Sequence, residues 1–439
     1  MQCRRAPLAA LLLLALAAAS PAPAAATWGA SRRLQAFAAS SPPEPPLAFA
    51  NEQGALMAVW NANGYVKAAV REPPAGGGAW GSPAIPDITG SGAASSPSAP
   101  LAALGSSGAA AVAFATVGTR YAKSKLAVAL RAPGGAAFGP PAAVDAAGGS
   151  TDAALAVDCA GAVTLAFANA TGVFATTLDG TPGPGPCTGA PAALAAGAAW
   201  PAPLAALGAG SGVRLAANGA GAVLAVWAGP GGVMAALKPA GGGWGAARQV
   251  VAGAAYGVTP FVASTGRPII GLQQGTSAFF ASAGPAGDDW GAPALASGSK
   301  AVSIAAFAAD ASGRLLAAWL APEPSGLTRV WAATADGPGA AWAAPKTVST
   351  TSDDPADPTA SASGDVLIVG WVNNAANTAR VAVRAPASAA WVRYNLGRGW
   401  WGLTVPVAAG GAGAALAAWA QPGTTNVNAA TMMARPWLT

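Results

Sequence analysis

Histidine is absent from the sequence, and its absence removes whole classes of chemistry. Ser-His-Asp and Cys-His catalysis, general base work by an imidazole and histidine-ligated metal sites all require this residue. Glutamate is also scarce, because the chain contains only Glu44, Glu52, Glu72 and Glu323. Carboxylate chemistry of the kind that glycosidases use remains open, since it needs only a pair of acids.

Charge of either sign is rare. Only 9% of the 439 residues are charged, 53% are hydrophobic, and the formal net charge is +6. This composition argues against disorder driven by charge repulsion and is ample for a large core. The weakly basic balance gives no reason to expect a nucleic-acid partner.

Long apolar runs are few. A basic start, the apolar stretch Pro7–Ala19 and small residues before Thr27 are typical of a signal peptide over residues 1–26. The stretch is shorter than the roughly 20 residues of a membrane span, although a retained N-terminal anchor stays an alternative. A second apolar run, Val405–Ala420, contains three glycines and fits the repeat described below. We therefore expect a secreted, extracellular protein without a membrane span after signal removal.

The chain contains three cysteines, of which Cys3 leaves with the signal peptide. Two cysteines in a secreted protein suggest one disulfide, here Cys159–Cys187, with two buried thiols as the alternative. The sequon Asn169-Ala170-Thr171 predicts N-glycosylation at Asn169.

Alanine and glycine dominate what is present, and alanine favours helices. The apolar runs are nevertheless only five to eight residues long and end at Gly, Pro or Asn, which favours strands. The stretch Gly221–Val250 gives the template. A glycine turn leads into an apolar strand ending in Trp227, a second strand ends in Lys238-Pro239, and a Gly-rich loop precedes Trp244-Gly245. The pattern recurs about every 50 residues, a period typical of repeat architectures.

We divide the chain into eight units of four strands, named a to d in chain order. Most units end strand b in an aromatic residue and strand c in a basic residue before a proline, and open strand d with Trp-Gly or Phe-Gly. The fifth unit is the most degenerate, and the third has Cys187 near the expected tryptophan. The units cover residues 47–87, 101–145, 154–190, 204–251, 259–297, 304–348, 357–397 and 405–439.

The eighth unit stops before its strand d, and residues 27–36 begin with Thr27-Trp28-Gly29, which matches the missing strand. A ring closed by this N-terminal strand leaves only short, protected edges. The sequence therefore predicts an all-β fold, a β-propeller of about eight four-stranded blades in a single domain over residues 27–439. Seven blades are the alternative if the fifth unit merges with a neighbour. Strands buried on both faces between blades explain the continuous apolar runs, and the recurrent aromatics are predicted to fill the space between sheets.

The repeat resembles the secreted bacterial propeller repeats that combine a G-x-x-x-x-x-W strand, a basic-Pro turn and a G-W-G-x-P strand, which are loosely related to the sialidase-like propellers. The resemblance covers almost all of the mature chain and implies the fold. The sialidase Asp-box, S-x-D-x-G-x-T-W, is not found, because the closest fragment, Asp310–Gly313, lacks its other positions. No sialidase catalytic residue is therefore carried over.

Candidate binding residues lie in the enlarged b–c loops, since loops on a rigid scaffold concentrate binding groups. These candidates are Arg120, Tyr121 and Lys123 first, and then Arg329, Asn373, Asn374 and Arg380. Basic residues also recur before a proline at the end of strand c, at Arg71, Arg131, Lys238, Arg384 and Arg435. They could bind an acidic polysaccharide on one rim, or simply solubilise a nearly uncharged surface. The acidic cluster Asp353, Asp354 and Asp357 is a weak Ca²⁺ candidate, with a Pro/Asp turn as the alternative.

These observations favour a secreted, non-catalytic propeller, a monomer, that binds extracellular polysaccharide or protein and needs no cofactor apart from a possible Ca²⁺. A sialidase-like glycoside hydrolase or lyase that uses carboxylates is the first alternative. It would need two acids, or an acid and a tyrosine, at the central mouth. A structural wall or matrix protein is the second alternative.

Overall fold

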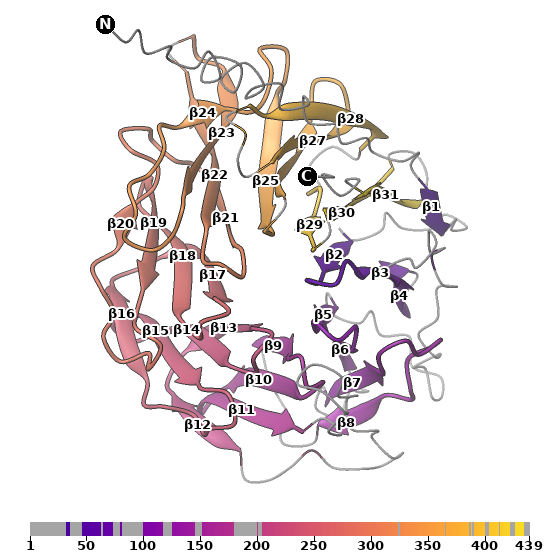
Figure 1. Ribbon diagram of the computed structural model, residues 1–439, viewed down its shortest axis with the longest axis vertical. Coiled ribbons are helices and arrows are strands. Elements are labelled where there is room, and N and C mark those ends of the chain that lie inside the picture. The colour runs from indigo at the N-terminus through magenta and orange to yellow at the C-terminus, as the bar shows by residue number, and fades with distance from the viewer. Residues whose placement is uncertain are drawn as a thin grey trace, which may run out of the picture.

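The computed structural model describes residues 32–35, 46–62, 65–72, 80, 100–116, 125–144, 152–179, 200, 204–323, 325–364, 366–385, 388, 390–399, 404–411, 413–421 and 426–433. These residues form 31 β-strands and no helix (Figure 1). The part of the chain that is described thus contains no helix with the length and apolar character to cross a membrane.

The strands form eight antiparallel sheets arranged as a ring, so the fold is the predicted eight-bladed β-propeller (Figure 1). Seven sheets have four strands and the first has three among the described residues. The segment predicted as the fourth strand of that first sheet, opening at Trp80-Gly81, lies almost entirely outside them. The seven-blade alternative is wrong, because the fifth unit forms a sheet of its own.

Each blade places strand a nearest the centre and strand d outermost. The first four blades consist of β2 (Leu47–Ala50), β3 (Leu56–Ala62) and β4 (Tyr65–Arg71); β5 (Leu101–Leu104), β6 (Ala110–Thr116), β7 (Lys125–Arg131) and β8 (Ala142–Val144); β9 (Asp152–Val157), β10 (Val163–Asn169), β11 (Gly172–Leu178) and β12 (Ala205–Gly208); and β13 (Ser211–Ala217), β14 (Val223–Gly229), β15 (Gly232–Lys238) and β16 (Arg248–Ala252).

The last four blades follow the same order. They consist of β17 (Tyr256–Val262), β18 (Pro268–Gln274), β19 (Ser277–Ser282) and β20 (Ala294–Leu295); β21 (Ala305–Ala309), β22 (Leu315–Pro322), β23 (Thr328–Ala335) and β24 (Lys346–Thr347); β25 (Pro355–Ala362), β26 (Leu367–Asn373), β27 (Thr378–Arg384) and β28 (Val392–Arg398); and β29 (Val407–Ala409), β30 (Ala414–Ala420), β31 (Val427–Met433) and the N-terminal β1 (Arg32–Gln35).

The N-terminal strand closes the last blade as predicted. β1 pairs antiparallel with β31, with Arg32 opposite Ala429 and Arg33 opposite Asn428. The innermost strands contact one another in sequence round the ring, and β29 of the last blade reaches β2 of the first. The two ends of the repeat array therefore meet in one sheet.

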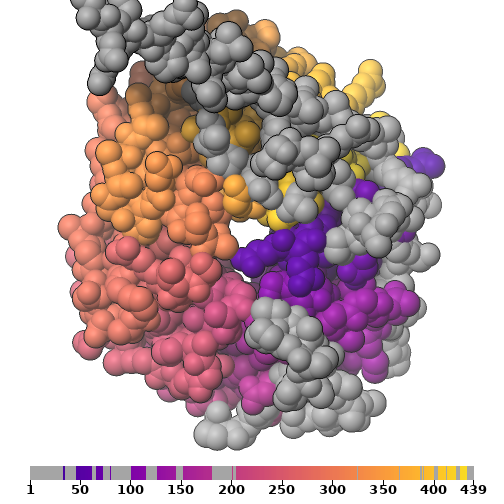
Figure 2. Space-filling model, in the orientation of Figure 1, coloured from indigo at the N-terminus to yellow at the C-terminus, as the bar shows by residue number. Residues whose placement is uncertain are grey.

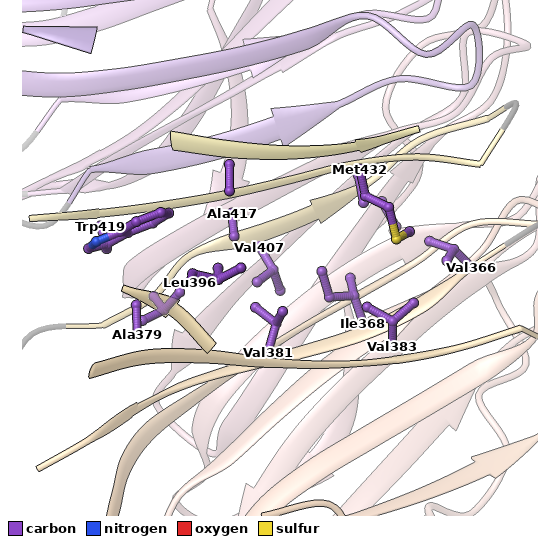
Figure 3. Close-up of a cluster of buried hydrophobic side chains, with 14 of the residues drawn as sticks. Val366, Ile368, Ala379, Val381, Val383, Leu396, Val407, Ala417, Trp419 and Met432 are labelled. Atoms are coloured by element: carbon purple, nitrogen blue, oxygen red, sulfur yellow. The ribbon is translucent and has the colours of Figure 1, made fainter. Parts of the chain in front are cut away.

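The core is divided among the interfaces between blades, because each of eight buried apolar clusters joins the facing sides of two neighbouring sheets. Figure 3 shows the cluster between the seventh and eighth blades, where Ile368 and Val381 face Val407 and Trp419. Strand b contributes to two clusters at once, since Met57 and Leu56 are neighbours in β3 but belong to different clusters. This confirms the predicted burial of the apolar runs on both faces.

The recurrent aromatics pack in register at these interfaces. Every blade directs one large apolar residue near the end of strand b toward the preceding blade, and these residues are Trp60, Phe114, Phe167, Trp227, Leu272, Trp319, Trp371 and Trp419. A second aromatic, ahead of strand d, packs against the same cluster in the first seven blades, at Trp80, Phe138, Trp200, Trp244, Trp290, Trp342 and Trp391. Burying one such side chain contributes roughly 1.5–3 kcal/mol, so the predicted packing role is confirmed.

The third blade differs from its predicted boundaries. Its strand d is β12, which pairs with β11, and not a segment near Cys187. Trp200, ahead of β12, holds the interface position that the sequence pattern assigned to the region of Cys187. The blade therefore extends to Gly208, and the fourth blade begins at Ser211, because a long c–d connection interrupts the repeat period.

Candidate functional site

The turns fall on two rims of the ring. The a–b and c–d turns share one rim, and the b–c turns share the other, which we call the b–c rim, with the connections between blades. The blades surround a central opening (Figure 2). On the b–c rim, where the innermost strands of blades four to seven begin, a cleft of about 850 Å³ opens. This volume falls within the range of about 300–1,000 Å³ typical of small-molecule sites.

Local backbone geometry shapes the cleft wall. Strands β13, β17 and β25 each contain a register shift near their start. Inside each shift lies a residue in the left-handed region, namely Gly212 (φ 66°), Gly257 (φ 58°) or Asp357 (φ 44°). A bulge of this kind bends a strand and redirects its side chains. In all three strands the residue two positions further on lines the cleft, and these residues are Arg214, Thr259 and Thr359.

The cleft walls are mostly backbone and small side chains. The b–c turn of blade four contributes Gly229 to Gly232, and the connection to blade five contributes Gly253 to Ala255. Phe307 adds an aromatic edge, and Arg214 is the one charged residue of the lining. None of the lining residues, all of them in the described part, is Asp or Glu. Asp152 is the carboxylate that touches this wall, where it accepts a hydrogen bond of 3.0 Å from the backbone N–H of Gly212.

Exposed apolar side chains gather on the same rim. Tyr256, at the start of β17, is 66% exposed, and its neighbours Ala255 and Gly257 line the cleft. Ile304, in the connection to blade six, and Leu327, in the b–c turn of that blade, are also exposed. Exposed apolar groups beside a hollow are typical of binding surfaces.

Most of the predicted binding residues do not form part of this cleft. Arg120, Tyr121 and Lys123 lie outside the described residues. Arg329 and Asn373 are described and are each only 1% exposed, so neither presents a surface for a ligand. The burial of these two side chains does not favour the binding role, which stays a prediction.

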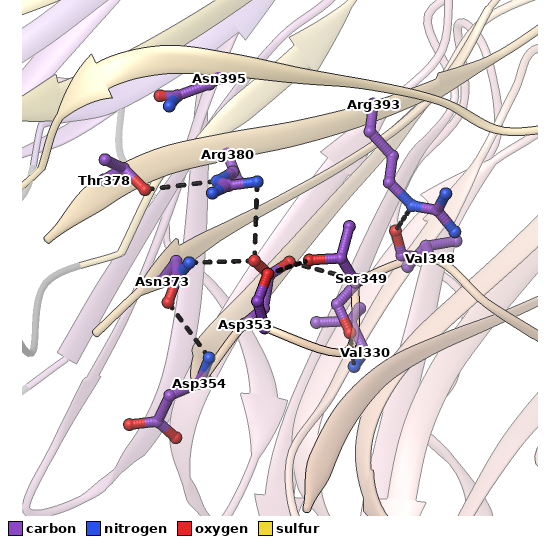
Figure 4. A network of polar contacts seen from close by, with 12 residues as sticks. Val330, Val348, Ser349, Asp353, Asp354, Asn373, Thr378, Arg380, Arg393 and Asn395 are labelled. Carbon is purple, nitrogen blue, oxygen red and sulfur yellow. Dashed lines mark hydrogen bonds and ion pairs between the residues drawn. The ribbon is translucent and has the colours of Figure 1, made fainter. Parts of the chain in front are cut away.

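The four described candidates, Arg329, Asn373, Asn374 and Arg380, instead take part in polar contacts between blades six and seven. Figure 4 shows Asn373 and Arg380 beside Asp353. Arg329 forms an ion pair of 3.3 Å with Glu323 and donates to the backbone carbonyl of Thr350. Asp353 accepts a hydrogen bond of 2.9 Å from Asn373 and forms an ion pair of 3.5 Å with Arg380. A buried charge of this kind is stable only when it is paired, which accounts for the residue types in these loops.

The half-buried Asn374 joins the same loop through its backbone N–H, which donates to the carbonyl of Asp354 at 2.9 Å.

The same network includes two of the three acids of the predicted Ca²⁺ site. The Asp353 carboxylate is already occupied by Arg380 and Asn373, and the Asp354 N–H donates to the Asn373 side chain at 3.1 Å. Asp357 occupies the bulge of β25. Among the described residues no group of three or more acidic or thiol side chains is placed to hold a metal ion. Asp353 closes a turn that begins at Thr350, whereas Asp357 lies within β25, so the turn interpretation covers only part of the cluster and the Ca²⁺ site stays a prediction.

The basic residues at the ends of strands c join neighbouring blades. Arg71 donates to Thr431 of the eighth blade at 2.7 Å, and Arg384 donates to Thr334 of the sixth at 3.2 Å. Arg131 forms an ion pair with Glu72 of the first blade and is 5% exposed. These three side chains are therefore used in contacts between blades and do not form a binding rim. Arg435 lies outside the described residues.

Cys159 and Asn169 are both in turns of the third blade. Cys159 is buried in the a–b turn, whereas Cys187 lies outside the described residues, so the disulfide stays a prediction. Asn169 begins the tight b–c turn, and its side-chain oxygen accepts hydrogen bonds of 2.8 and 2.7 Å from the backbone and hydroxyl of Thr171. The turn is at the surface, where glycosylation would have to occur.

Among the described a–b turns, the turn of the third blade contains a buried acid with a shifted pKa, Asp158, next to Cys159. Its carboxylate accepts a hydrogen bond of 2.9 Å from the N–H of Ala162. Burial raises the pKa of Asp158 above its ordinary value of 3.8, opposed by that hydrogen bond and by the nearby Lys238. Asn51 and Asn218 hold the same turn position in blades one and four, with the same acceptor role.

Sequence reasoning missed the cleft because glycine and alanine, which form its walls, carry no chemical signature. One signal was present. Arg214 is a charged residue in an innermost strand, where the corresponding stretches of blades five and six have Thr259 or small apolar residues.

Comparisons with known proteins support the fold. No protein-family model matches the sequence, and no curated protein matches it. Among solved structures, a chain from a structural study of two prolyl endopeptidases resembles this chain with a TM-score of 0.51 and 11% identity over 83% of this chain and 50% of that chain. The polysaccharide lyase Uly1 gives 0.45 and 9% over 74% and 88%, and the α-L-arabinanase of Penicillium chrysogenum gives 0.39 and 10% over 93% and 98%. Likeness at these identities concerns the fold alone.

Proposed function

We propose that this protein is an extracellular, non-catalytic binding module that takes a carbohydrate ligand in the cleft on the b–c rim. The observation that carries the proposal is the cleft itself, whose volume of about 850 Å³ suits an oligosaccharide and whose walls are Gly-rich backbone. Exposed backbone N–H and C=O groups can satisfy sugar hydroxyls, which both donate and accept hydrogen bonds. The predicted signal peptide supports an extracellular role.

The chemistry of the lining favours binding over hydrolysis. Glycosidases place two carboxyl groups roughly 5–10 Å apart across the scissile bond. The lining residues contribute no carboxyl group, and Asp152, at the edge, is engaged by the N–H of Gly212. A binding module has no need of such a pair. The third possibility, a purely structural protein, predicts no saturable ligand at all.

The test is binding of the mature chain to a panel of immobilised neutral and acidic glycans, with Ala254→Trp as the blocking variant. Ala254 is exposed and lines the cleft, so a tryptophan there fills the hollow without entering the core. Ala246→Trp is the matched control, because Ala246 is also exposed but precedes β16 on the far side of blade four. We expect at least tenfold weaker glycan binding by the first variant and no change in the second. Equal binding by both variants, or no glycan binding by the intact protein, would overturn the proposal.

A further inference from the structure

The strongest unused chemical group on the b–c rim is the guanidinium of Arg214. Arg214 follows the bulge of β13 and pairs with Val226 of β14. Its side chain is exposed and lines the cleft, and one of its nitrogens donates to the backbone carbonyl of Val213 at 2.9 Å. A guanidinium has five N–H donors, so most of the hydrogen-bond donors of Arg214 are available to a ligand in the cleft or to solvent.

Arg214 differs in this respect from four other arginines of the described residues. Arg131, Arg314, Arg329 and Arg380 each form an ion pair with a carboxylate. In the described part of the chain Arg214 has no carboxylate partner. The cleft therefore holds one positive charge and no compensating negative charge among its lining residues.

The surroundings of Arg214 suit an anionic group on a polyhydroxylated ligand. The planar fork of arginine matches a carboxylate through two parallel hydrogen bonds, and such charge-assisted bonds are about twice as strong as neutral ones. Thr259 and Thr359 line the same cleft, where their hydroxyls donate to the carbonyls of Gly257 and Val405 and keep an acceptor lone pair for a sugar hydroxyl, and the glycine turns offer backbone groups. No lining residue carries a carboxylate to offset the charge of Arg214, and Asp152 at the edge of the wall is bonded to the backbone N–H of Gly212.

Resting on the proposed carbohydrate function, we infer that the ligand is an acidic saccharide, and that Arg214 is the specificity-determining residue that binds a uronate carboxylate. A neutral sugar of the same linkage would leave the guanidinium hydrated and would gain nothing from the charge. The cleft therefore discriminates acidic from neutral chains through this one side chain.

The test uses oligosaccharides of polygalacturonate, alginate and hyaluronan, each beside its carboxyl-reduced neutral counterpart, and measures Kd by calorimetry at two salt concentrations. We expect the intact protein to bind at least one acidic oligosaccharide tenfold or more tightly than its reduced form, and to lose affinity as salt rises. Arg214→Gln should abolish the preference and the salt dependence, and Arg214→Lys should keep part of both. Arg248→Gln, on the exposed outer strand β16 of the same blade, is the matched control and should bind as the intact protein does.

The outcomes separate this inference from the proposed function. Equal affinity for acidic and reduced forms, or a preference that survives in Arg214→Gln, overturns the inference. If neutral glycans still bind and Ala254→Trp abolishes their binding, the proposed function stands without it. If no glycan binds, both fail. Thermal unfolding of Arg214→Gln should match that of the intact protein, because the side chain makes one hydrogen bond, to its own neighbour.

Discussion

At the scale of single residues, several of the few charged side chains of this protein hold neighbouring blades together. Arg131 lies at the end of β7 and joins Glu72 of the first blade while it also donates to the Gly108 carbonyl at 3.1 Å. Glu72 is 39% exposed, whereas Arg131 is buried. If the contact breaks, water can solvate the glutamate but not the arginine, so the unfavourable free energy falls mainly on Arg131. An isolated basic residue in a repeat thus reflects the contact between blades and not a charged surface.

Arg131→Met tests this role. The substitution keeps the apolar stem but leaves the buried Gly108 carbonyl without its donor, so the free energy of unfolding should fall by about 1–3 kcal/mol. Denaturant unfolding measures the change, and Arg248→Met at an exposed site should stay within about 0.5 kcal/mol of the intact protein. Equal stability of the two variants would contradict a structural role for Arg131.

Asp158 provides a prediction about pH. Because burial raises the pKa of Asp158, the folded state binds a proton more tightly than the unfolded state in the pH range between the two pKa values. The contribution to stability is present below the unfolded value of 3.8 and is lost as pH rises through the folded pKa. Asp158→Asn should therefore be more stable than the intact protein at pH 7, with its amide oxygen still accepting from Ala162.

The difference should shrink as the pH is lowered toward 3.8, and melting temperatures across this range measure it. Asn218→Asp is the converse variant, because Asn218 holds the same position and donates to the Ala263 carbonyl at 2.8 Å. That variant should lose stability at pH 7. If the difference in melting temperature between Asp158→Asn and the intact protein did not depend on pH, the raised pKa of Asp158 would be contradicted.

The sequence could reveal which residues were polar and in loops, but not which of them would be buried together. Arg329 and Asn373 were predicted as binding residues because they lie in or beside enlarged loops. Their partners Glu323 and Asp353 are near in sequence, yet only the fold buries these groups together. Burial turns a candidate ligand contact into a structural ion pair, and sequence spacing alone does not report burial.

At the scale of strands, the approach of one sheet to the next is set by small residues in strand b. Gly271 of β18 is such a position, because a Cβ atom there would overlap the ring of Phe307 from the next blade. Phe307 in turn packs edge-on against Phe280, with ring centroids 5.3 Å apart. Phe307 and Phe280 thus fill the interface between the fifth and sixth blades, on the face of β18 opposite to Leu272.

Gly271→Ala tests this packing. The added methyl group must displace Phe307, so stability should fall by about 1–3 kcal/mol. Gly243→Ala is the matched control, because a Cβ at Gly243 meets nothing within 4 Å. A second substitution, Phe307→Ala, removes the Cγ and ring atoms that the methyl group meets, so the loss in the double variant should be smaller than the sum of the two single losses, which a double-mutant cycle detects. Independent, additive effects of the two substitutions would rule out the proposed contact.

Strands b and c were predictable because their apolar runs and aromatics keep a constant register. In seven of the eight blades, strand b carries a Trp or Phe at the interface position, and each of these side chains is buried as expected. Strand d of the third blade was not predictable in the same way. The long segment between β11 and β12 breaks the period, so Trp200 was not assigned to the third repeat. Pairing with β11, which no local pattern encodes, decides where β12 belongs.

At the scale of the whole molecule, closure of the ring depends on one short strand. β1 covers the outer edge of β31, so deleting residues 27–36 exposes a row of unpaired backbone groups. We expect this truncated chain to melt at a lower temperature than a chain that begins at residue 27, and to associate at high concentration. Light scattering and thermal unfolding measure both effects. An unchanged, monomeric truncation would show that β1 does not close the blade.

The two rims of the ring differ in character, and this difference directs the functional proposal. The rim of a–b turns is occupied by contacts between blades, such as the hydrogen bond of 2.9 Å from Asn51 to the Gly105 carbonyl. The b–c rim contains the cleft, the exposed Tyr256 and the guanidinium of Arg214, which has no carboxylate partner among the described residues. Recognition is therefore expected at the b–c rim, close to the central opening.

A crystal structure of the protein with a bound acidic oligosaccharide tests the central claim most directly. We predict that the sugar lies in the cleft between β13 and β25, with a uronate carboxylate within hydrogen-bond distance of the Arg214 guanidinium. A saccharide seated instead on the rim of a–b turns, or in the cleft with its carboxylate directed away from Arg214, would contradict the account.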